Sequence, residues 1–292
     1  MKKSCVLVSG GAGYIGSHTT VELINAGYDV VIVDNLSNSD ISAVEGVRRI
    51  TGAEIPFVKV DCCDREAFRK VFEQYEFDSV IHFAASKAVG ESVQKPLEYY
   101  GNNLKSFMNV ISLMREFGRQ NIVFSSSCTV YGEPEKQPIE EGDRTEPTNP
   151  YGATKLAIEN MLKWCDCAYN IRYVALRYFN ACGAHMSGKI GEAHDPETHL
   201  IPIILQVPNG RRDHVSIYGD DYPTRDGTCV RDYIHVTDLA SAHILAAEYL
   251  MNGGENNVFN LGNGVGFTVK EIIDTAEKVV GKPIKCEMAP RR

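Results

Sequence analysis

A glycine-rich segment close to the N-terminus constrains the fold of this chain more than any other feature. It directly follows residues 5–8, a short β-branched run, and a helix is predicted after it over residues 15–25. A second strand is predicted over 30–33 and ends in Asp34, about twenty residues beyond the glycines. The glycines are Gly10, Gly11, Gly13 and Gly16. This order of strand, glycines, helix, strand and acid predicts a dinucleotide-binding βαβ unit.

Each part of this unit has a physical reason. Glycines let the backbone turn tightly and approach a diphosphate, and the helix N-terminus offers N–H groups and a positive dipole end to the phosphates. Asp34 can accept hydrogen bonds from a ribose 2′-hydroxyl, whereas its charge would repel a 2′-phosphate. We therefore expect NAD as the cofactor rather than NADP.

The composition excludes several classes of protein. Hydrophobic residues make up 43% and charged residues 23% of the 292 residues, as in ordinary globular proteins. The net charge of −8 argues against general binding to nucleic acid or to anionic membranes. The N-terminal apolar run is too short for a signal sequence or a membrane span. We expect a cytoplasmic protein that acts on a small molecule.

The cysteines and histidines give no sign of a metal centre. Nine cysteines are scattered along the chain without a Cys-x-x-Cys pair, which indicates reduced thiols rather than disulfides or a zinc site. One further group lies in a segment predicted to be irregular and lacks ligand-like spacing: His185, His194, Asp195 and His199. We therefore expect no metal.

The alternation of strands and helices continues well past the glycine segment. Further strands are predicted over 55–60, 79–83, 121–124 and 172–177, with helices over 65–75, 96–117 and 151–169. Six strands with intervening helices predict a Rossmann-type doubly wound parallel sheet as an NAD-binding domain over 1–178. The rhythm then breaks, and a smaller mixed α/β substrate lobe is expected over 179–292. Within it we expect helices over 202–207 and 236–250, a strand over 214–218, and a capping box at Thr268 that opens a helix to about Val279.

Tyr151 and Lys155 lie four residues apart in a predicted helix, and therefore on the same helix face. A free phenol has a pKa of about 10, and a nearby ammonium group lowers that pKa by favouring the phenolate. Such a tyrosine can take a proton from an alcohol while the adjacent carbon loses hydride. Ser127 ends a serine run at the carboxyl end of a predicted strand, where ligands bind in open parallel sheets. Ser127 is thus placed to bond the reacting hydroxyl.

These residues carry a resemblance to a known family. The chain resembles the extended short-chain dehydrogenase/reductases that modify nucleotide sugars, and among them the UDP-glucose 4-epimerase family. The resemblance covers the whole chain. It rests on the segments 10–16, 34–38, 82–92, 125–132, 150–155, 177–180, 226–236 and 290–292. The segments 82–92 and 226–236 are more specific to these epimerases than the glycine and Tyr-x-x-x-Lys motifs.

The resemblance implies a role for each matching residue. Besides the glycines, the NAD site would contain Tyr14, Ile15, Asp34, Asn35, Ser37, Asn38, Asp61, Cys62, Phe83, Ala84, Ala85, Ser86, Lys87, Asn102, Tyr151, Lys155 and Phe179. The UDP-sugar site would contain Ser127, Tyr151, Asn180, His199, Leu200, Ser216, Ile217, Tyr218, Arg231 and Arg292. Catalysis would fall to Ser127, Tyr151 and Lys155.

The implied activity is the interconversion of UDP-galactose and UDP-glucose in galactose metabolism, through a 4-keto intermediate and with tightly bound NAD. Tyr151 would take the proton of the sugar 4-hydroxyl, and hydride would leave C4 and return to its other face. The resemblance also implies a homodimer that pairs through the helices at 96–117 and 151–169. Relatives continue for several tens of residues beyond the arginine pair, so we expect the second lobe to be incomplete at its C-terminus. The missing part would include the residue that decides whether N-acetylated sugars fit.

Three other functions stay open. Nucleotide-sugar 4,6-dehydratases resemble this chain, but they typically carry an Asp-Glu pair where Cys128 and Thr129 stand. A 4-epimerase for UDP-pentoses or UDP-uronic acids would show the same motifs. A non-catalytic dinucleotide sensor would usually lack the Tyr–Lys pair that this chain keeps.

Overall fold

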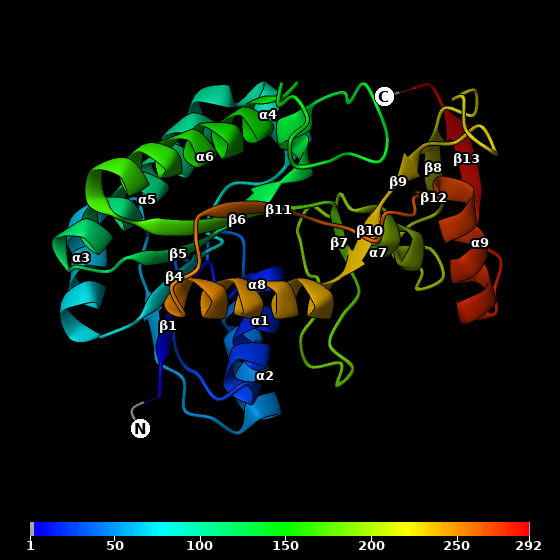
Figure 1. Ribbon diagram of the computed structural model, residues 1–292. Coiled ribbons are helices and arrows are strands. Elements are labelled where there is room, and N and C mark those ends of the chain that lie inside the picture. Colours follow the sequence, from blue (N-terminus) through cyan, green and yellow to red (C-terminus); the bar gives the residue numbers. More distant parts are fainter. Residues whose placement is uncertain (1–2, 292) are drawn as a thin grey trace.

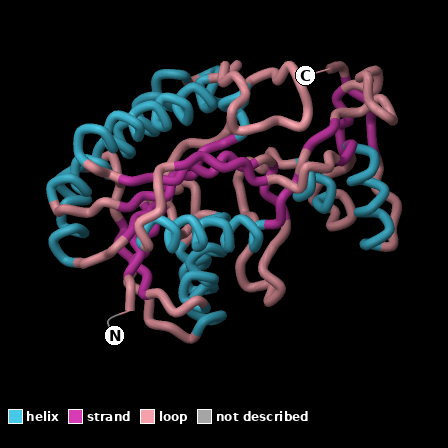
Figure 2. Tube along the Cα trace, viewed as in Figure 1, coloured by secondary structure: helices cyan, strands magenta, loops and turns pink. Residues whose placement is uncertain are grey.

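The computed structural model describes residues 3–291. A parallel sheet of seven strands, in the order β11-β6-β5-β4-β1-β2-β3, forms its centre (Figures 1 and 2). The strands are β1 (Cys5–Ser9), β2 (Asp29–Asp34), β3 (Phe57–Lys59), β4 (Ser79–His82), β5 (Asn121–Ser127), β6 (Arg172–Tyr178) and β11 (Asn257–Leu261). The strand order reverses between β1 and β4, as in the Rossmann fold. The predicted fold class is confirmed.

Helices cover both faces of this sheet (Figure 1). One face carries α1 (Tyr14–Asn25), α2 (Ile41–Thr51) and α8 (Val236–Met251). The other carries α3 (Arg65–Gln74), α5 (Pro96–Glu116) and α6 (Pro150–Tyr169), with the short α4 (Val89–Gln94) beside α6. Successive strand residues point to opposite faces, so Leu7 packs under α3 and α5 while its neighbours Val6 and Val8 pack against α1 and α8.

Side-chain caps fix where several helices begin. The carboxylates of Asp40 and Asp64 accept backbone N–H bonds at the starts of α2 and α3, and the amide oxygen of Asn149 does so for α6. The predicted capping box at Thr268 is confirmed, because its side chain and that of Glu271 bond each other's backbone N–H groups. The Asn149 cap is the important one for function, since α6 carries Tyr151 in its first turn.

The chain returns to the sheet after residue 178. The sequence predicts six strands, which is wrong by one: β11 pairs in parallel with β6 at the sheet edge. The sequence predicts a helix over 236–250 within the second lobe. The helix forms as α8, but it packs against α1 and the sheet. Residues 257–261 escaped detection because the sequence of this short edge strand, Asn-Val-Phe-Asn-Leu, does not alternate polar and apolar residues.

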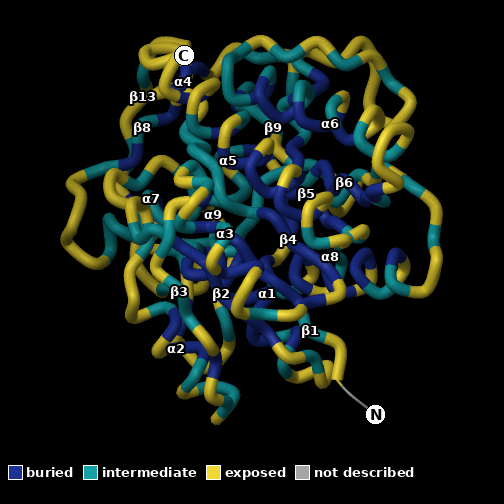
Figure 3. The backbone as a smooth tube through the Cα atoms, turned by 90° about the vertical axis from the view of Figure 1, so that its left-hand side faces the viewer, coloured by how far each residue is buried: buried dark blue, intermediate teal, exposed yellow. Residues whose placement is uncertain are grey.

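A smaller mixed lobe stands beside the carboxyl ends of the strands (Figure 1). Its elements are β7 (Asn180–Cys182), α7 (Leu200–Gln206), β8 (Val215–Tyr218), β9 (Val230–Arg231), β10 (Tyr233–His235), β12 (Phe267–Thr268), α9 (Val269–Val280) and β13 (Cys286–Ala289). Its core is a cluster around Ile204, Ile217 and Ile273, separate from the two layers that flank the sheet. Figure 3 shows β4 and β5 as the buried centre of the molecule. Among residues 3–291, no helix is long and apolar enough to cross a membrane.

Candidate active site

The glycine segment forms a tight turn between β1 and α1. Gly10 has a φ of 76°, and a Cβ added there would lie 2.7 Å from the backbone nitrogen of Ala84. A Cβ on Gly16 would lie 2.3 Å from the carbonyl oxygen of Gly10. Gly13 is the N-cap of α1 and has no side chain to bond the helix amides. The sequence therefore keeps this helix start free of side chains, as a diphosphate site requires.

Asp34 ends β2 beside this turn and is 8% exposed. Its carboxylate accepts the backbone N–H of Ala12 at 3.1 Å and that of Leu36 at 2.9 Å, and the hydroxyl of Ser39 at 2.8 Å. These bonds hold the carboxylate at the mouth of the glycine turn. The predicted ribose-binding acid therefore lies next to the predicted phosphate site.

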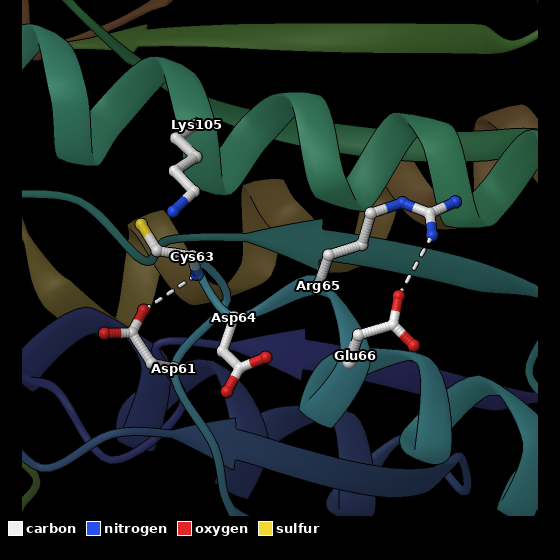
Figure 4. Close-up of a pocket in the computed structure, with 6 residues that line it drawn as sticks. All are labelled: Asp61, Cys63, Asp64, Arg65, Glu66 and Lys105. Atoms are coloured by element: carbon white, nitrogen blue, oxygen red, sulfur yellow. Dashed lines mark hydrogen bonds and ion pairs between the residues drawn. The ribbon is translucent and has the colours of Figure 1, made fainter.

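Two of the other residues predicted to line the cofactor site, Asn35 and Asp61, contact each other. The Asn35 amide donates to the Asp61 carboxylate at 3.3 Å, and its oxygen accepts the Ser37 N–H at 2.9 Å. Cys62 is buried beside them, while Asn38 is exposed. A cavity of about 480 Å³ opens next to Asp61, and Figure 4 shows Lys105 and Cys63 on its wall. This hollow lies at the carboxyl end of β3.

The segment after β4 packs onto the glycine turn. The N–H groups of Phe83 and Ala84 donate to the Ser9 carbonyl at 2.9 and 3.1 Å. Ser86 is bonded by Asn102, which donates to its hydroxyl at 3.1 Å, and its N–H donates to Asn103 at 2.8 Å. Asn103 also donates to Thr154 of α6 at 3.0 Å and is buried. Sequence reasoning missed Asn103, which joins the predicted cofactor loop to the helix of Tyr151.

The structure brings the three predicted catalytic residues together at the carboxyl end of β5. Ser127 is the last residue of β5 and lies beside the Tyr151 hydroxyl, and its Oγ accepts the Thr129 hydroxyl at 3.0 Å. Lys155 lies one turn along α6, with its Nζ 5.6 Å from the centroid of the Tyr151 ring. The Lys155 ammonium donates to the Ser125 carbonyl at 2.7 Å and is 2% exposed. All three side chains are therefore held by their surroundings.

The electrostatics of this group differ from the sequence expectation. Burial raises the pKa of Tyr151, with a contribution from Tyr178, and the neighbouring Ser127 hydroxyl offsets only part of that rise. The sequence expectation was a phenol pKa lowered by Lys155. Burial has the largest effect on the pKa of Tyr151 because it penalises the phenolate. Burial also lowers the pKa of Lys155 to about 7. Glu159 opposes the change at Lys155.

A buried ion pair that the sequence did not reveal supports this end of α6. Glu159 accepts bonds from the guanidinium of Arg177 at 3.0 and 2.6 Å, and the Ser126 hydroxyl donates to it at 2.5 Å. Glu159 is 1% and Arg177 5% exposed. Glu159 lies four residues beyond Lys155 on α6. Its bonds with Ser126 and Arg177 join that helix to β5 and β6. Only the fold brings residues 159 and 177 together, so no local pattern could have shown it.

The predicted UDP residues that the structure describes come from the second lobe. Asn180 donates to the Asp232 carbonyl at 2.7 Å, and Arg231 donates to the Val230 carbonyl at 2.7 Å. Burial raises the pKa of the Cys128 thiol to about 11, and the Arg231 guanidinium offsets part of this, so Arg231 faces the residue after Ser127. Ser216, Ile217 and Tyr218 lie in β8, while His199 and Leu200 begin α7. Arg292 lies outside the described residues.

The chain matches a known protein family. Residues 6–262 match the model of the NAD dependent epimerase/dehydratase family. The chain belongs to this family. It is 52% identical over 287 residues to a UDP-glucose 4-epimerase of Halalkalibacterium halodurans, covering 98% of the chain and 84% of that relative. It is 47% identical over 300 residues to the UDP-glucose 4-epimerase of Mus musculus, covering 98% of the chain and 85% of that relative.

Solved structures of this epimerase family share the fold closely. The UDP-glucose 4-epimerase of Brucella ovis in complex with NAD has a TM-score of 0.94 at 48% identity, covering 99% of this chain and 86% of that one. The enzyme of Bifidobacterium longum in complex with NAD+ and UDP has a TM-score of 0.95 at 46% identity, covering 99% of this chain and 87% of that one. The predicted membership of an NAD-linked epimerase family is confirmed.

The three histidines named in the sequence analysis as a possible metal group do not all lie together in the structure. His185 bonds Ser187 at 2.8 Å and lies apart from the others. His194 and His199 come together instead with two carboxylates, those of Glu192 and Glu197. Burial alone would raise the pKa of Glu192, but the nearby imidazoles of His194 and His199 lower it to about 2. The Lys87 amine contacts the ring of His194, which joins this cluster to the predicted cofactor loop.

Proposed function

We propose that this protein is an NAD-dependent UDP-glucose 4-epimerase, an isomerase that interconverts UDP-galactose and UDP-glucose. The observation that carries the proposal is the meeting of Ser127, Tyr151 and Lys155 beside a glycine turn and Asp34. The glycine turn and Asp34 fit NAD, since the turn leaves room for a diphosphate and the acid suits a 2′-hydroxyl. Relatives of about 50% identity named UDP-glucose 4-epimerase support the choice of substrate.

The residues of this chain divide the work. Bound NAD supplies a hydride acceptor at sugar C4 and a hydride donor for the return. Tyr151 takes the proton of the 4-hydroxyl and later returns it to the 4-keto oxygen. Ser127 donates a hydrogen bond to that oxygen, and Lys155, one turn further along α6, binds the nicotinamide ribose. Because the proton and the hydride both return, the reaction is redox-neutral.

The UDP group needs a cationic clamp. Arg231 has a planar guanidinium that can donate two parallel hydrogen bonds to a diphosphate. The proposal assigns the same role to Arg292, and uridine contacts to Asn180, His199, Leu200 and the β8 residues 216–218. In this proposal residues 1–178 carry the NAD site. Residues 179–292 supply the UDP-sugar lobe, and they also supply α8 and β11, which complete the sheet domain. The remaining NAD contacts are those named from the sequence, from Tyr14 to Phe179.

The assay is the conversion of UDP-galactose, followed by proton NMR of the anomeric signals with no cofactor added. The proposal expects UDP-glucose to appear and to reach a fixed ratio with UDP-galactose. A 4,6-dehydratase would instead give a 4-keto-6-deoxy product, and a sensor would give no product. The Tyr151→Phe variant is the matched control, since it removes only the hydroxyl that moves the proton. Absence of turnover after NAD is supplied would reject the epimerase function.

We also propose a cytoplasmic homodimer. Eight cysteines are free thiols, which suits a reducing compartment: Cys62, Cys63, Cys128, Cys165, Cys167, Cys182, Cys229 and Cys286. Helices α5 and α6 expose several large apolar side chains, among them Leu97 at 84%, Trp164 at 75% and Met108 at 48%. An isologous pairing of these two helices with a second copy would cover them. Light scattering should give twice the chain mass for the wild type, and a monomer for Trp164→Glu. A wild-type monomer would reject the dimer.

A further inference from the structure

Four side chains between β7 and α7 converge on one point. They are Glu192, His194, Glu197 and His199, and one ligand atom from each lies within 4.8 Å of all the others. The Nδ1 of His199 lies 2.8 Å from a Glu192 oxygen and 2.9 Å from a Glu197 oxygen. The Nδ1 of His194 lies 3.2 and 3.6 Å from oxygens of the same two carboxylates. Both imidazoles thus turn the same nitrogen inward.

Four donor atoms that converge in this way suit a tetrahedral metal ion. Zn²⁺ binds histidine nitrogen at about 2.0–2.1 Å and carboxylate oxygen at about 2.0–2.2 Å, so neighbouring ligand atoms lie about 3.4 Å apart. The two distances from His194, 3.2 and 3.6 Å, lie close to this value, and the two from His199, 2.8 and 2.9 Å, are shorter. Imidazole and carboxylate are also donors that Zn²⁺ takes together.

His199 lies within hydrogen-bond distance of both carboxylates, but burial leaves the inward nitrogen of His194 without a partner. The side chains of Glu192, His194 and Glu197 are 7%, 8% and 6% exposed. The Nδ1 of His194 is aimed into the cluster but makes no hydrogen bond to any residue that the structure describes. Two buried carboxylates facing each other need positive charge between them, and a buried nitrogen needs a partner. A divalent cation supplies both.

Lys87 does not fill the place of that cation. Its amine contacts the Nε2 of His194, on the ring edge opposite the cluster. An ammonium there requires Nε2 to accept, whereas a metal on Nδ1 leaves Nε2 carrying the proton. Binding of the ion therefore requires Lys87 to turn away from His194 or to give up its proton. The cluster and the predicted cofactor loop are coupled through this one contact.

We propose that Glu192, His194, Glu197 and His199 bind one Zn²⁺ ion, a structural site that the sequence did not predict. Four protein ligands leave no open position, as in structural rather than catalytic zinc sites. The ion links residues 192–194 to residues 197–199 within the connection between β7 and α7. This connection lies next to α1, where Tyr14 donates to the Gly183 carbonyl at 2.5 Å. A cavity of about 430 Å³ lined by Glu192, His194 and Glu197 gives the ion a way in.

The test is metal binding by the full chain without an affinity tag. Protein stripped with a chelator is titrated with Zn²⁺ against a chromophoric competitor. We expect one Zn²⁺ per chain and a higher thermal midpoint with the ion bound. His194→Ala should weaken binding by more than about 100-fold, since losing even an outer partner of a ligand costs about 10- to 100-fold. His214→Ala, a histidine outside the cluster, should bind as the wild type does.

Two readouts keep the proposal falsifiable if a variant fails to fold. Zinc-edge X-ray absorption of the wild type should show only nitrogen and oxygen neighbours. A sulfur shell would place the ion on the free cysteines and overturn the proposal. So would sub-stoichiometric binding by the wild type, or equal binding by His194→Ala. None of these readouts depends on epimerase activity, so the zinc site and the proposed function can fail separately.

Discussion

The buried pair of Glu159 and Arg177 gives a sharp test of how the active-site helix is held. Glu159→Gln keeps the shape of the side chain and one oxygen acceptor but removes the negative charge. Arg177 then stays charged, with only the Tyr131 hydroxyl at 2.8 Å and the Glu141 carbonyl at 3.2 Å as its other partners. Both members are at most 5% exposed, so water cannot take the place of the lost carboxylate.

The size of the loss follows from burial. Removing one partner of a buried ion pair costs about 3–5 kcal/mol, because the other charge is left uncompensated. The retained amide oxygen can still accept from Arg177 or Ser126, which places the expected loss at about 3 kcal/mol. Urea unfolding followed by circular dichroism measures it. Glu116→Gln is the control: its partners Arg65 and Arg69 are on the surface, and we expect an unchanged midpoint.

A second variant separates the pair from its charges. Replacing both residues with apolar ones, as Glu159→Leu with Arg177→Met, leaves no orphaned charge in the core. The double variant should therefore lose less stability than the sum of the two single variants. If Glu159→Gln unfolds at the wild-type urea concentration, or if the two losses simply add, the pair does not hold α6 in the way described.

Three further predictions follow from the site. Tyr151→Phe should lower the rate of UDP-galactose conversion by about 10²–10⁴-fold and leave NAD bound, as measured by turnover and by NAD released on denaturation; normal turnover would contradict the role of the hydroxyl. Gly16→Ala should lower the NAD content of purified protein at least about tenfold, because its Cβ would lie 2.3 Å from a backbone oxygen, whereas Gly101→Ala, with no atom within 4 Å, should keep it. The third concerns Lys155, whose pKa falls from about 10.4 in an unfolded chain to about 7 in the fold. The folded chain then binds fewer protons than the unfolded chain between these values, so the free energy of unfolding should rise with pH from about 7 to about 10.4 relative to that of Lys155→Met. Urea titrations at several pH values would refute this if the two profiles ran parallel.

Local patterns predicted those parts of the fold that rest on local physics. Short β-branched runs predicted the first six strands, and the capping box predicted the start of α9. The spacing of Tyr151 and Lys155 gave their shared helix face, which the structure confirms with both on α6. In each of these cases the interacting residues lie within a few positions of each other.

What the sequence left out depends on residues brought together by the fold. The partner of Glu159 stands 18 positions away on β6, and Asn103 reaches Thr154 across 51 positions. Glu192 and Glu197 sit in an irregular connection, where no period marks which carboxylates turn inward. The direction of the Tyr151 pKa also depends on burial, which spacing along a helix does not reveal.

The late return of the chain to the sheet affects how this protein emerges from the ribosome. Strand β6 is complete at residue 178, but its neighbour β11 is made only at 257–261, after most of the second lobe. Until then β6 is an unpaired edge, and the face of the sheet later covered by α8 lacks that helix. A nascent chain therefore has to protect an incomplete sheet while about 80 more residues are added, at about 5–20 residues per second. Chaperone binding during synthesis is expected to be strongest in this interval and to fall once β11 has docked.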